Sequence, residues 1–205
     1  TQVLEASGLS LRVQFDFATT DRLAGALAQG ANVLHFSGHG HPHFVAFEDG
    51  RGRASLLDAK KLERLLKTVG GVQLAFVSAC HSRPTGEALV EAGVPHVVAV
   101  ETSDAVLDYA ATVFAKEFYR FLAAGRSVRD AFNIARAFLE ADPGLTNKPK
   151  EAEKLVLLPT NARHDAAIFA LAPPGPLEVV SRPLGACNLP TRREHFTGRA
   201  RELHN

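Results

Sequence analysis

The chain has 205 residues, of which 46% are hydrophobic and 22% are charged, and its formal net charge is +1. This length and composition allow one globular domain with a full core and little more. The balanced charge argues against capture by nucleic acid or an anionic membrane through a global electrostatic field, and we find neither an apolar stretch long enough to span a membrane nor a signal peptide.

Apolar runs of strand length alternate with amphipathic segments of helical period along the chain. The predicted strands are, in order, 11–17, 32–37, 45–48, 72–78, 97–100, 155–158 and 167–171. The predicted helices are 20–30, 55–69, 87–92, 105–123 and 127–139. Repeated β-α-β units of this kind predict an α/β fold in which a mostly parallel sheet carries helices on both faces.

Polar residues mark the starts of three predicted helices. Thr20 is expected to cap the first, while Ser55-x-x-Asp58 and Ser127-x-x-Asp130 have the spacing of a capping box. These signals support helices that begin close to the listed boundaries.

The cysteines and the end of the chain bear on its cellular context. The two cysteines, Cys80 and Cys187, lie far apart with no disulfide framework, which is typical of a reducing compartment and predicts a cytoplasmic protein. Residues 173–190 hold five prolines and show no periodicity, so we expect a linker that leaves the domain. The sequence contains no Met, and we expect it to be a piece of a longer protein.

Two predicted strands end at residues with catalytic chemistry. The run 32–37 stops at Gly-His-Gly (38–40), and the run 72–78 stops at Ala-Cys-His (79–81). The carboxyl ends of parallel strands form the edge where α/β proteins bind their ligands. A thiol and an imidazole that meet at this edge are the minimum equipment for catalysis by a thiolate.

The candidate roles follow from this arrangement. Cys80 is the candidate nucleophile and His39 the candidate general base, and the N–H groups of Gly40 and Cys80 are candidates for an oxyanion hole. Glycine beside His39 also lets a substrate backbone approach closely. The alternative interpretations are a structural cysteine at a strand end and a turn histidine in a glycine-rich loop.

The histidines allow a second kind of site. His39-x-His41-x-His43 places alternate imidazoles on one side of an extended segment, with His35 nearby, and HxH at a strand end also occurs in zinc hydrolases. No carboxylate-rich partner motif accompanies these histidines. We therefore expect solvated loop histidines and no bound metal.

Acidic residues cluster after the third buried strand, at Glu101, Asp104 and Asp108. One interpretation is helix capping, because carboxylates are favoured at a helix start. The other is a pocket for a basic substrate side chain. No phosphate-binding loop motif occurs, and the basic residues are scattered apart from Arg192 and Arg193.

Several segments together resemble a known family. LHFSGHG, FEDGRG, VSACHS, EAGVPHVVAVETSD and AATVFAKEFYRFLAAGRSVRDAFNIAR occur in the order seen in the CHAT family of caspase-like proteins, over roughly Leu11 to Leu171. The resemblance implies a clan CD cysteine peptidase with a caspase-like three-layer α/β/α sandwich and a dyad of His39 and Cys80.

The resemblance also bears on specificity. The segment 79–82 is similar to metacaspases, which carry an acidic residue two positions before the cysteine for a basic P1 side chain; here that position is Ser78. Separases, also similar, have an acidic residue after the third strand, which matches Asp104. The resemblance thus implies a basic P1 residue bound by Asp104, with Ser78 and Glu101 lining the pocket. The acidic set that gives metacaspases their calcium dependence is missing, so no cofactor is expected.

The end of the chain suggests a further module. FTGRAREL (196–203) resembles the start of STAND-type signalling NTPases. We therefore expect a CHAT protease domain over residues 1–172, followed over 173–205 by a proline-rich linker and the beginning of a truncated downstream module. CHAT domains are commonly fused to such sensors in prokaryotic defence and cell-death systems. The implied partners are a protein substrate and this regulatory module, with no direct binding of nucleic acid or membrane.

The expected function is that of a cysteine endopeptidase which acts as the effector domain of a larger signalling protein. Two other classes stay open on the sequence alone. One is a non-catalytic CHAT-like interaction module, and the other is a zinc-dependent hydrolase that uses the histidine cluster.

Overall fold

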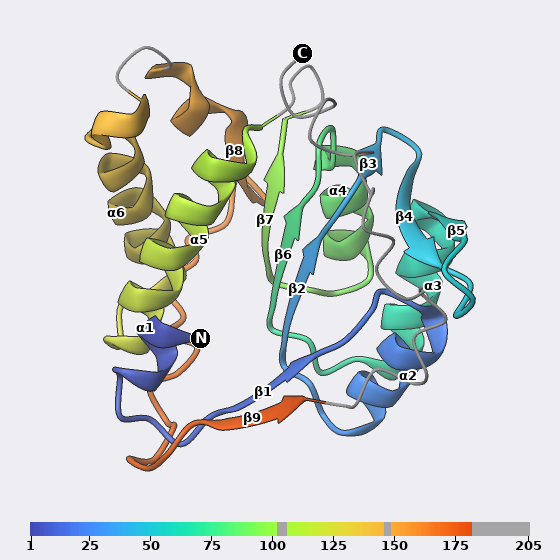
Figure 1. Ribbon diagram of the computed structural model, residues 1–205, viewed down its shortest axis with the longest axis horizontal. Coiled ribbons are helices and arrows are strands. Elements are labelled where there is room, and N and C mark those ends of the chain that lie inside the picture. Colours follow the sequence, from blue (N-terminus) through green and yellow to red (C-terminus); the bar gives the residue numbers. More distant parts are fainter. Residues whose placement is uncertain (102–105, 146–148, 182–205) are drawn as a thin grey trace, which may run out of the picture.

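The computed structural model describes residues 1–101, 106–145 and 149–181 and has the predicted mixed α/β fold (Figure 1). Its helices are α1 (Gln2–Glu5), α2 (Thr20–Ala28), α3 (Ala59–Val69), α4 (Arg83–Glu91), α5 (Asp108–Ala123) and α6 (Val128–Glu140), with the short 3-10 helices η1 (Pro143–Leu145) and η2 (Pro149–Lys154). Its strands are β1 (Arg12–Phe15), β2 (Val33–Ser37), β3 (Gly40–His41), β4 (Phe44–Glu48), β5 (Ala54–Asp58), β6 (Leu74–Ser78), β7 (His96–Val100), β8 (Leu155–Leu158) and β9 (Glu178–Ser181). Within these described ranges, no helix is both long and apolar enough to cross a membrane.

The central sheet has four strands in the order β2-β6-β7-β8 (Figure 1). β6 pairs in parallel with β2 and β7, and β8 runs antiparallel to β7. β6 and β7 form the middle of the sheet, and every residue of β7 is buried. Such strands are covered on both faces, which explains why they appear in the sequence as continuous apolar runs. The carboxyl ends of β2, β6 and β7 therefore meet at one edge.

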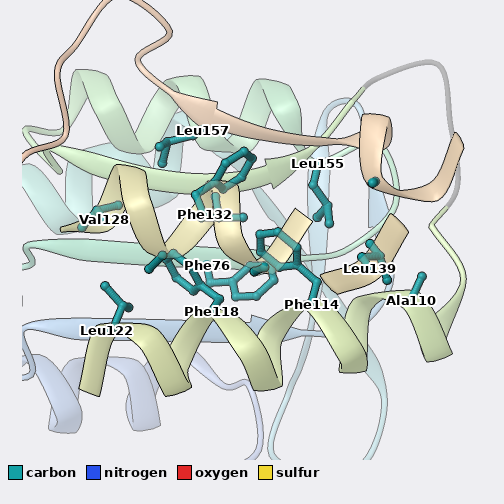
Figure 2. Close-up of a cluster of buried hydrophobic side chains, with 14 of the residues drawn as sticks. Phe76, Ala110, Phe114, Phe118, Leu122, Val128, Phe132, Leu139, Leu155 and Leu157 are labelled. Carbon is teal, nitrogen blue, oxygen red and sulfur yellow. The ribbon is translucent and has the colours of Figure 1, made fainter. Parts of the chain in front are cut away.

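Each face of the sheet packs on its own group of helices. On β6, Leu74 and Phe76 belong to the hydrophobic cluster formed with α5 and α6, whereas Ala75 and Val77 belong to the cluster formed with α2, α3 and α4. The fully buried ring of Phe76 lies edge-to-face against Phe114, with 5.8 Å between the ring centroids. Figure 2 shows the side chains of α5 and α6 converging on Phe76. This double packing holds β6, and thus the segment that follows it, in a fixed position.

β1 lies outside the central sheet, as part of a two-stranded ribbon with β9 (Figure 1). Residues 178–181, within the segment predicted to be a linker, thus form a strand. β2 is left as an edge strand of the central sheet, and a cleft of about 1590 Å³ is lined by residues of both β1 and β2. His39 also lines this cleft.

Two predicted caps differ from those observed. The side chain of Thr19, not Thr20, accepts a hydrogen bond from the Arg22 N–H at the start of α2. Asp58 caps α3 by accepting from the Lys60 N–H at 2.8 Å, whereas Ser55 lies within β5. The capping-box interpretation of residues 55–58 was therefore wrong, because the strand continues up to the cap. The third predicted cap is confirmed, since the side chain of Ser127 accepts from the Asp130 N–H.

The predicted strand 167–171 is also wrong. This segment forms turns, in which the Ala170 N–H donates to the Ala167 carbonyl and the Ala172 N–H donates to the Phe169 carbonyl. The consecutive residues Ile168 and Phe169 both pack on the cluster under α5 and α6. A strand would send these two side chains to opposite faces, so the turn buries more apolar surface there.

Candidate active site

The register between β2 and β6 brings the two candidate catalytic residues to the same level of the sheet edge. Ser37 pairs with Ser78 at the ends of these strands, and the Gly38 N–H donates to the Ser78 carbonyl at 3.2 Å. His39 and Cys80 each follow two residues after that pair. The expectation that both residues sit just past the carboxyl ends of adjacent parallel strands is therefore met by the backbone.

Gly40 packs directly against the backbone that carries Cys80. A Cβ atom built on Gly40 would overlap the carbonyl oxygen of Cys80 and would lie 2.8 Å from the Cβ of Ala79. Real Cβ atoms do not make such contacts, so only glycine permits this approach. From the sequence, the glycine was expected to let a substrate backbone approach. In the structure, the absence of a Cβ on Gly40 lets the loop that carries Cys80 approach.

The two side chains differ in exposure. Cys80 is half-buried and His39 is exposed to solvent. Both belong to the described part of the chain, and their side chains are not hydrogen-bonded to each other. His39 is anchored through its backbone, since its carbonyl accepts from the Ala46 N–H of β4 at 3.0 Å. The imidazole is thus carried at the start of a short hairpin that packs against the backbone of Cys80.

The hairpin also decides which way the Gly40 amide points. Gly40 pairs with Val45 in antiparallel, and the bond from the Ala46 N–H to the His39 carbonyl flanks this pair. Gly40 and Val45 are consequently a non-hydrogen-bonded pair, whose own N–H groups face away from the partner strand. The Gly40 N–H is therefore not used by the β3–β4 ladder and is free to act as a donor.

Cys80 leaves β6 in a tight turn that leads into α4. His81 adopts a left-handed backbone conformation with φ 55°, which is uncommon for a residue other than glycine. α4 begins at Arg83, with Ser82 at the cap position and Pro84 in the first turn, earlier than the predicted start at residue 87. The first-turn N–H groups and the helix dipole favour negative charge close to Cys80.

The acidic residues proposed to line a pocket are placed differently. The Glu101 carboxylate is paired with Arg83, whose Nη1 lies 2.6 Å from its Oε1, and Arg83 also contacts Glu87. The hydrogen bond to Glu87, and then the charge of Glu101, raise the pKa of Arg83. Ser78 is half-buried at the end of β6. Asp104 lies outside the described residues.

The start of α5 bears on the alternative interpretation of the acidic cluster. α5 begins at Asp108 and its cap position is Leu107, whose N–H donates to Glu151 Oε2 at 3.0 Å. The helix predicted from residue 105 thus starts three residues later.

Of the histidines that suggested a metal site, His41 and His43 lie together on the β3–β4 hairpin, with 5.4 Å between their ring centroids, whereas His35 lies in the central sheet. His35 lies on β2, where its Nδ1 is 3.0 Å from the hydroxyl of Tyr119 on α5. His41 belongs to the β3–β4 hairpin, where it stacks on Phe44 and its Nδ1 accepts from the His43 N–H. Across the described ranges, no group of three or more His, Cys, Asp and Glu side chains is arranged to hold a metal ion.

Two residues beside the site have structural roles that were not predicted from the sequence. Ser82 is fully buried and its hydroxyl makes two hydrogen bonds, to the ends of β6 and β7. Arg83 is the second, and its guanidinium is paired with Glu101. Neither arrangement has a local signal, because both depend on how β7 lies beside β6.

Comparison with known proteins identifies the family. The family model described as the CHAT domain matches residues 1–167, a span that includes β2, β6, β7 and both loops of the candidate site. The comparison with curated proteins finds no match. Since the matched span covers most of the 205 residues, the chain belongs to the CHAT domain family, which is related to the caspase-like proteases.

Proposed function

We propose that this chain is a cysteine endopeptidase in which Cys80 is the nucleophile and His39 the general base. His39 takes the thiol proton, and the thiolate attacks the carbonyl carbon of the scissile peptide bond. The N–H groups of Gly40 and Cys80 hold the resulting oxyanion. His39 then returns the proton to the departing amine, and water hydrolyses the acyl-enzyme.

One observation supports this function above the others: the backbone of Gly40 is in contact with that of Cys80. The two loops approach so closely that only glycine fits at position 40. This approach brings His39 and Cys80 together at the ligand-binding edge of the sheet. An interaction module has no need for this juxtaposition. His41 and His43 lie together, but among the described residues no third His, Cys, Asp or Glu side chain joins them to hold a metal ion, which gives no support to a zinc hydrolase.

The proposed specificity is for a basic P1 residue. Arg83 compensates the charge of Glu101, so we assign the main acidic contact to Asp104, with Ser78 and Glu101 lining the same pocket. A carboxylate at this place pairs well with the bidentate guanidinium of arginine. Cleavage after aspartate would contradict this part of the proposal.

The proposed context follows from the family. We propose a caspase-like three-layer α/β/α sandwich that acts in the cytoplasm as the effector domain of a larger prokaryotic defence or cell-death protein. Residues 173–205 would then connect it to a regulatory NTPase or sensor module of the same polypeptide. Its other partner is the protein substrate.

The test is peptide hydrolysis with a fluorogenic library that varies P1. Cys80→Ala and His39→Ala are expected to fold and to lose on the order of 10³-fold or more in kcat/KM, because a nucleophile and its base act as a unit. Cys187→Ser is the matched control and keeps full activity, and a chelator leaves the wild type unchanged. Robust hydrolysis by Cys80→Ala would contradict the assignment of Cys80 as the nucleophile. A wild type with no activity would favour an interaction module.

A further inference from the structure

Ser82 occupies an unusual position between the two central strands. Its side chain has no exposed surface. Its hydroxyl donates to the Val77 carbonyl of β6 at 2.9 Å and accepts from the Val100 N–H of β7 at 3.0 Å. One hydroxyl thus connects the backbones of two neighbouring strands near their carboxyl ends.

The pairing of β6 with β7 shows what this hydroxyl replaces. The ladder runs in register from Leu74–His96 to Phe76–Val98 and stops there. The Ser78 carbonyl faces β2, because it accepts from Gly38, so the Val77 carbonyl one residue earlier faces β7. Continued by one residue, the same register would pair the Val100 N–H directly with the Val77 carbonyl.

We propose that Ser82 is a positioning residue: its hydroxyl takes the place of the next β6–β7 ladder bond and thereby fixes the turn that presents Cys80. The inserted hydroxyl holds the two strand ends apart by the width of one oxygen atom. It also closes the segment 77–82 into a loop, with Cys80 between the two anchored ends.

The proposal rests on the proposed function, since it is the thiol of Cys80 that Ser82 places. The consequence is geometric. In Ser82→Ala, the Val77 carbonyl and the Val100 N–H are both buried and lose their partner, and a buried unpaired group is costly. The two groups can recover a bond only by closing on each other, which moves the Cys80 turn relative to Gly40.

The chain offers a matched control three residues further on. Thr85 is as fully buried as Ser82, but its hydroxyl has no hydrogen-bond partner. Thr85→Val removes a buried hydroxyl from the first turn of α4 without removing a bond. Ser82→Thr is the complementary variant, because it retains the hydroxyl.

Two measurements test the inference, both in a Cys187→Ser background so that Cys80 is the single thiol. The first is the rate of Cys80 alkylation by iodoacetamide as a function of pH, which reports on the thiol without any peptide substrate. The second is peptide hydrolysis with kcat and KM separated. A displacement of about 1 Å in a catalytic group costs on the order of 10²-fold, so Ser82→Ala is expected to lose about this much in kcat, with little change in KM and a shifted alkylation profile.

Thr85→Val is expected to match the wild type in both measurements, and Ser82→Thr to stay within a few-fold of it. If folded Ser82→Ala keeps the kcat and the alkylation profile of Thr85→Val, Ser82 has only a structural role and the inference is wrong. If Ser82→Ala does not fold, Ser82→Thr decides, and a tenfold or larger loss in kcat or an altered profile overturns the inference. A wild type without peptidase activity would contradict the proposed function but not this inference. The alkylation profiles would still measure the effect of Ser82 on the Cys80 thiol.

Discussion

At the scale of single residues, the smallest side chain at the site has the greatest geometric consequence. Gly40 lies against the Cys80 carbonyl, and a Cβ atom on Gly40 would be 2.8 Å from the Cβ of Ala79. Both neighbours belong to a turn held by β6 and by the hydrogen bonds of Ser82. A methyl group at position 40 therefore cannot be accommodated by a side-chain rotation, and the hairpin carrying His39 has to move.

Gly40→Ala is accordingly expected to lower kcat/KM by about 10²-fold, the effect of a displacement near 1 Å between reacting groups. The measurement is peptide hydrolysis together with a thermal unfolding curve. Gly25→Ala in α2 is the matched control, since a Cβ there meets nothing within 4 Å, and alanine in a helix is expected to raise stability by about 1 kcal/mol. Wild-type activity in Gly40→Ala would show that the two loops are not rigidly packed.

At the scale of elements, the boundary between β5 and α3 is set by one carboxylate. Asp58 is the last residue of β5 and also accepts the Lys60 N–H at the start of α3. Ser55, three residues earlier, is paired with Phe47 across the hairpin. The capping-box spacing of these two residues is therefore coincidental, and of the two only Asp58 caps the helix.

Asp58→Ala is expected to lower the free energy of unfolding by about 1 kcal/mol, the usual cost of losing an N-cap side chain. Ser55→Ala is expected to change it by less than about 0.5 kcal/mol, as for other surface substitutions. Urea denaturation of both variants measures the difference. Equal losses in the two variants would restore the capping-box interpretation.

The elements also show how far the sequence alone reaches. β6 and β7 are predicted because strands covered on both faces leave uninterrupted apolar runs, and β2, an edge strand without a fully buried residue, is predicted from a short and mostly apolar run. His39, Gly40 and Cys80 are found because they stand at the ends of β2 and β6. The turn at 167–171 is missed because a short apolar run does not reveal whether its residues point to one side or to two. The role of Ser82 between two strands and the Arg83–Glu101 pair are missed because Val100 and Glu101, the partners at the end of β7, each lie 18 residues away in the sequence.

At the scale of the whole molecule, the two ends of the central sheet have different chemistry. The carboxyl ends of β2, β6 and β7 carry the candidate active site. At the opposite end, His96 begins β7 and meets His164, which follows β8, with 2.7 Å between their Nδ1 atoms. His164 Nε2 lies 2.9 Å from the Pro159 carbonyl and donates to it. His164 Nδ1 in the neutral pair is consequently the acceptor, and His96 Nδ1 carries the shared proton.

This pair makes the fold sensitive to acid. Both side chains are buried, and burial lowers the pKa of each from the ordinary value of 6.5. The charge of His164 lowers the pKa of His96 further. Around His164, the Pro159 bond and Asp165 oppose the shift while Arg129 adds to it. The unfolded chain therefore binds protons at a higher pH than the folded chain.

The sign of the effect follows from linkage: the stability contributed by the neutral pair is complete above pH 6.5 and is lost progressively as the pH falls below that value. Urea denaturation at a series of pH values is expected to show this decline in the wild type. His96→Gln retains a side-chain donor toward His164 and is expected to flatten the decline, at a cost of about 1 kcal/mol at neutral pH for the altered hydrogen bond. His43→Gln, an exposed position on the β3–β4 hairpin, is the control and is expected to retain the wild-type pH dependence. If His96→Gln declines as steeply as His43→Gln, the acid sensitivity arises elsewhere and the buried pair does not titrate in the range in which the protein unfolds.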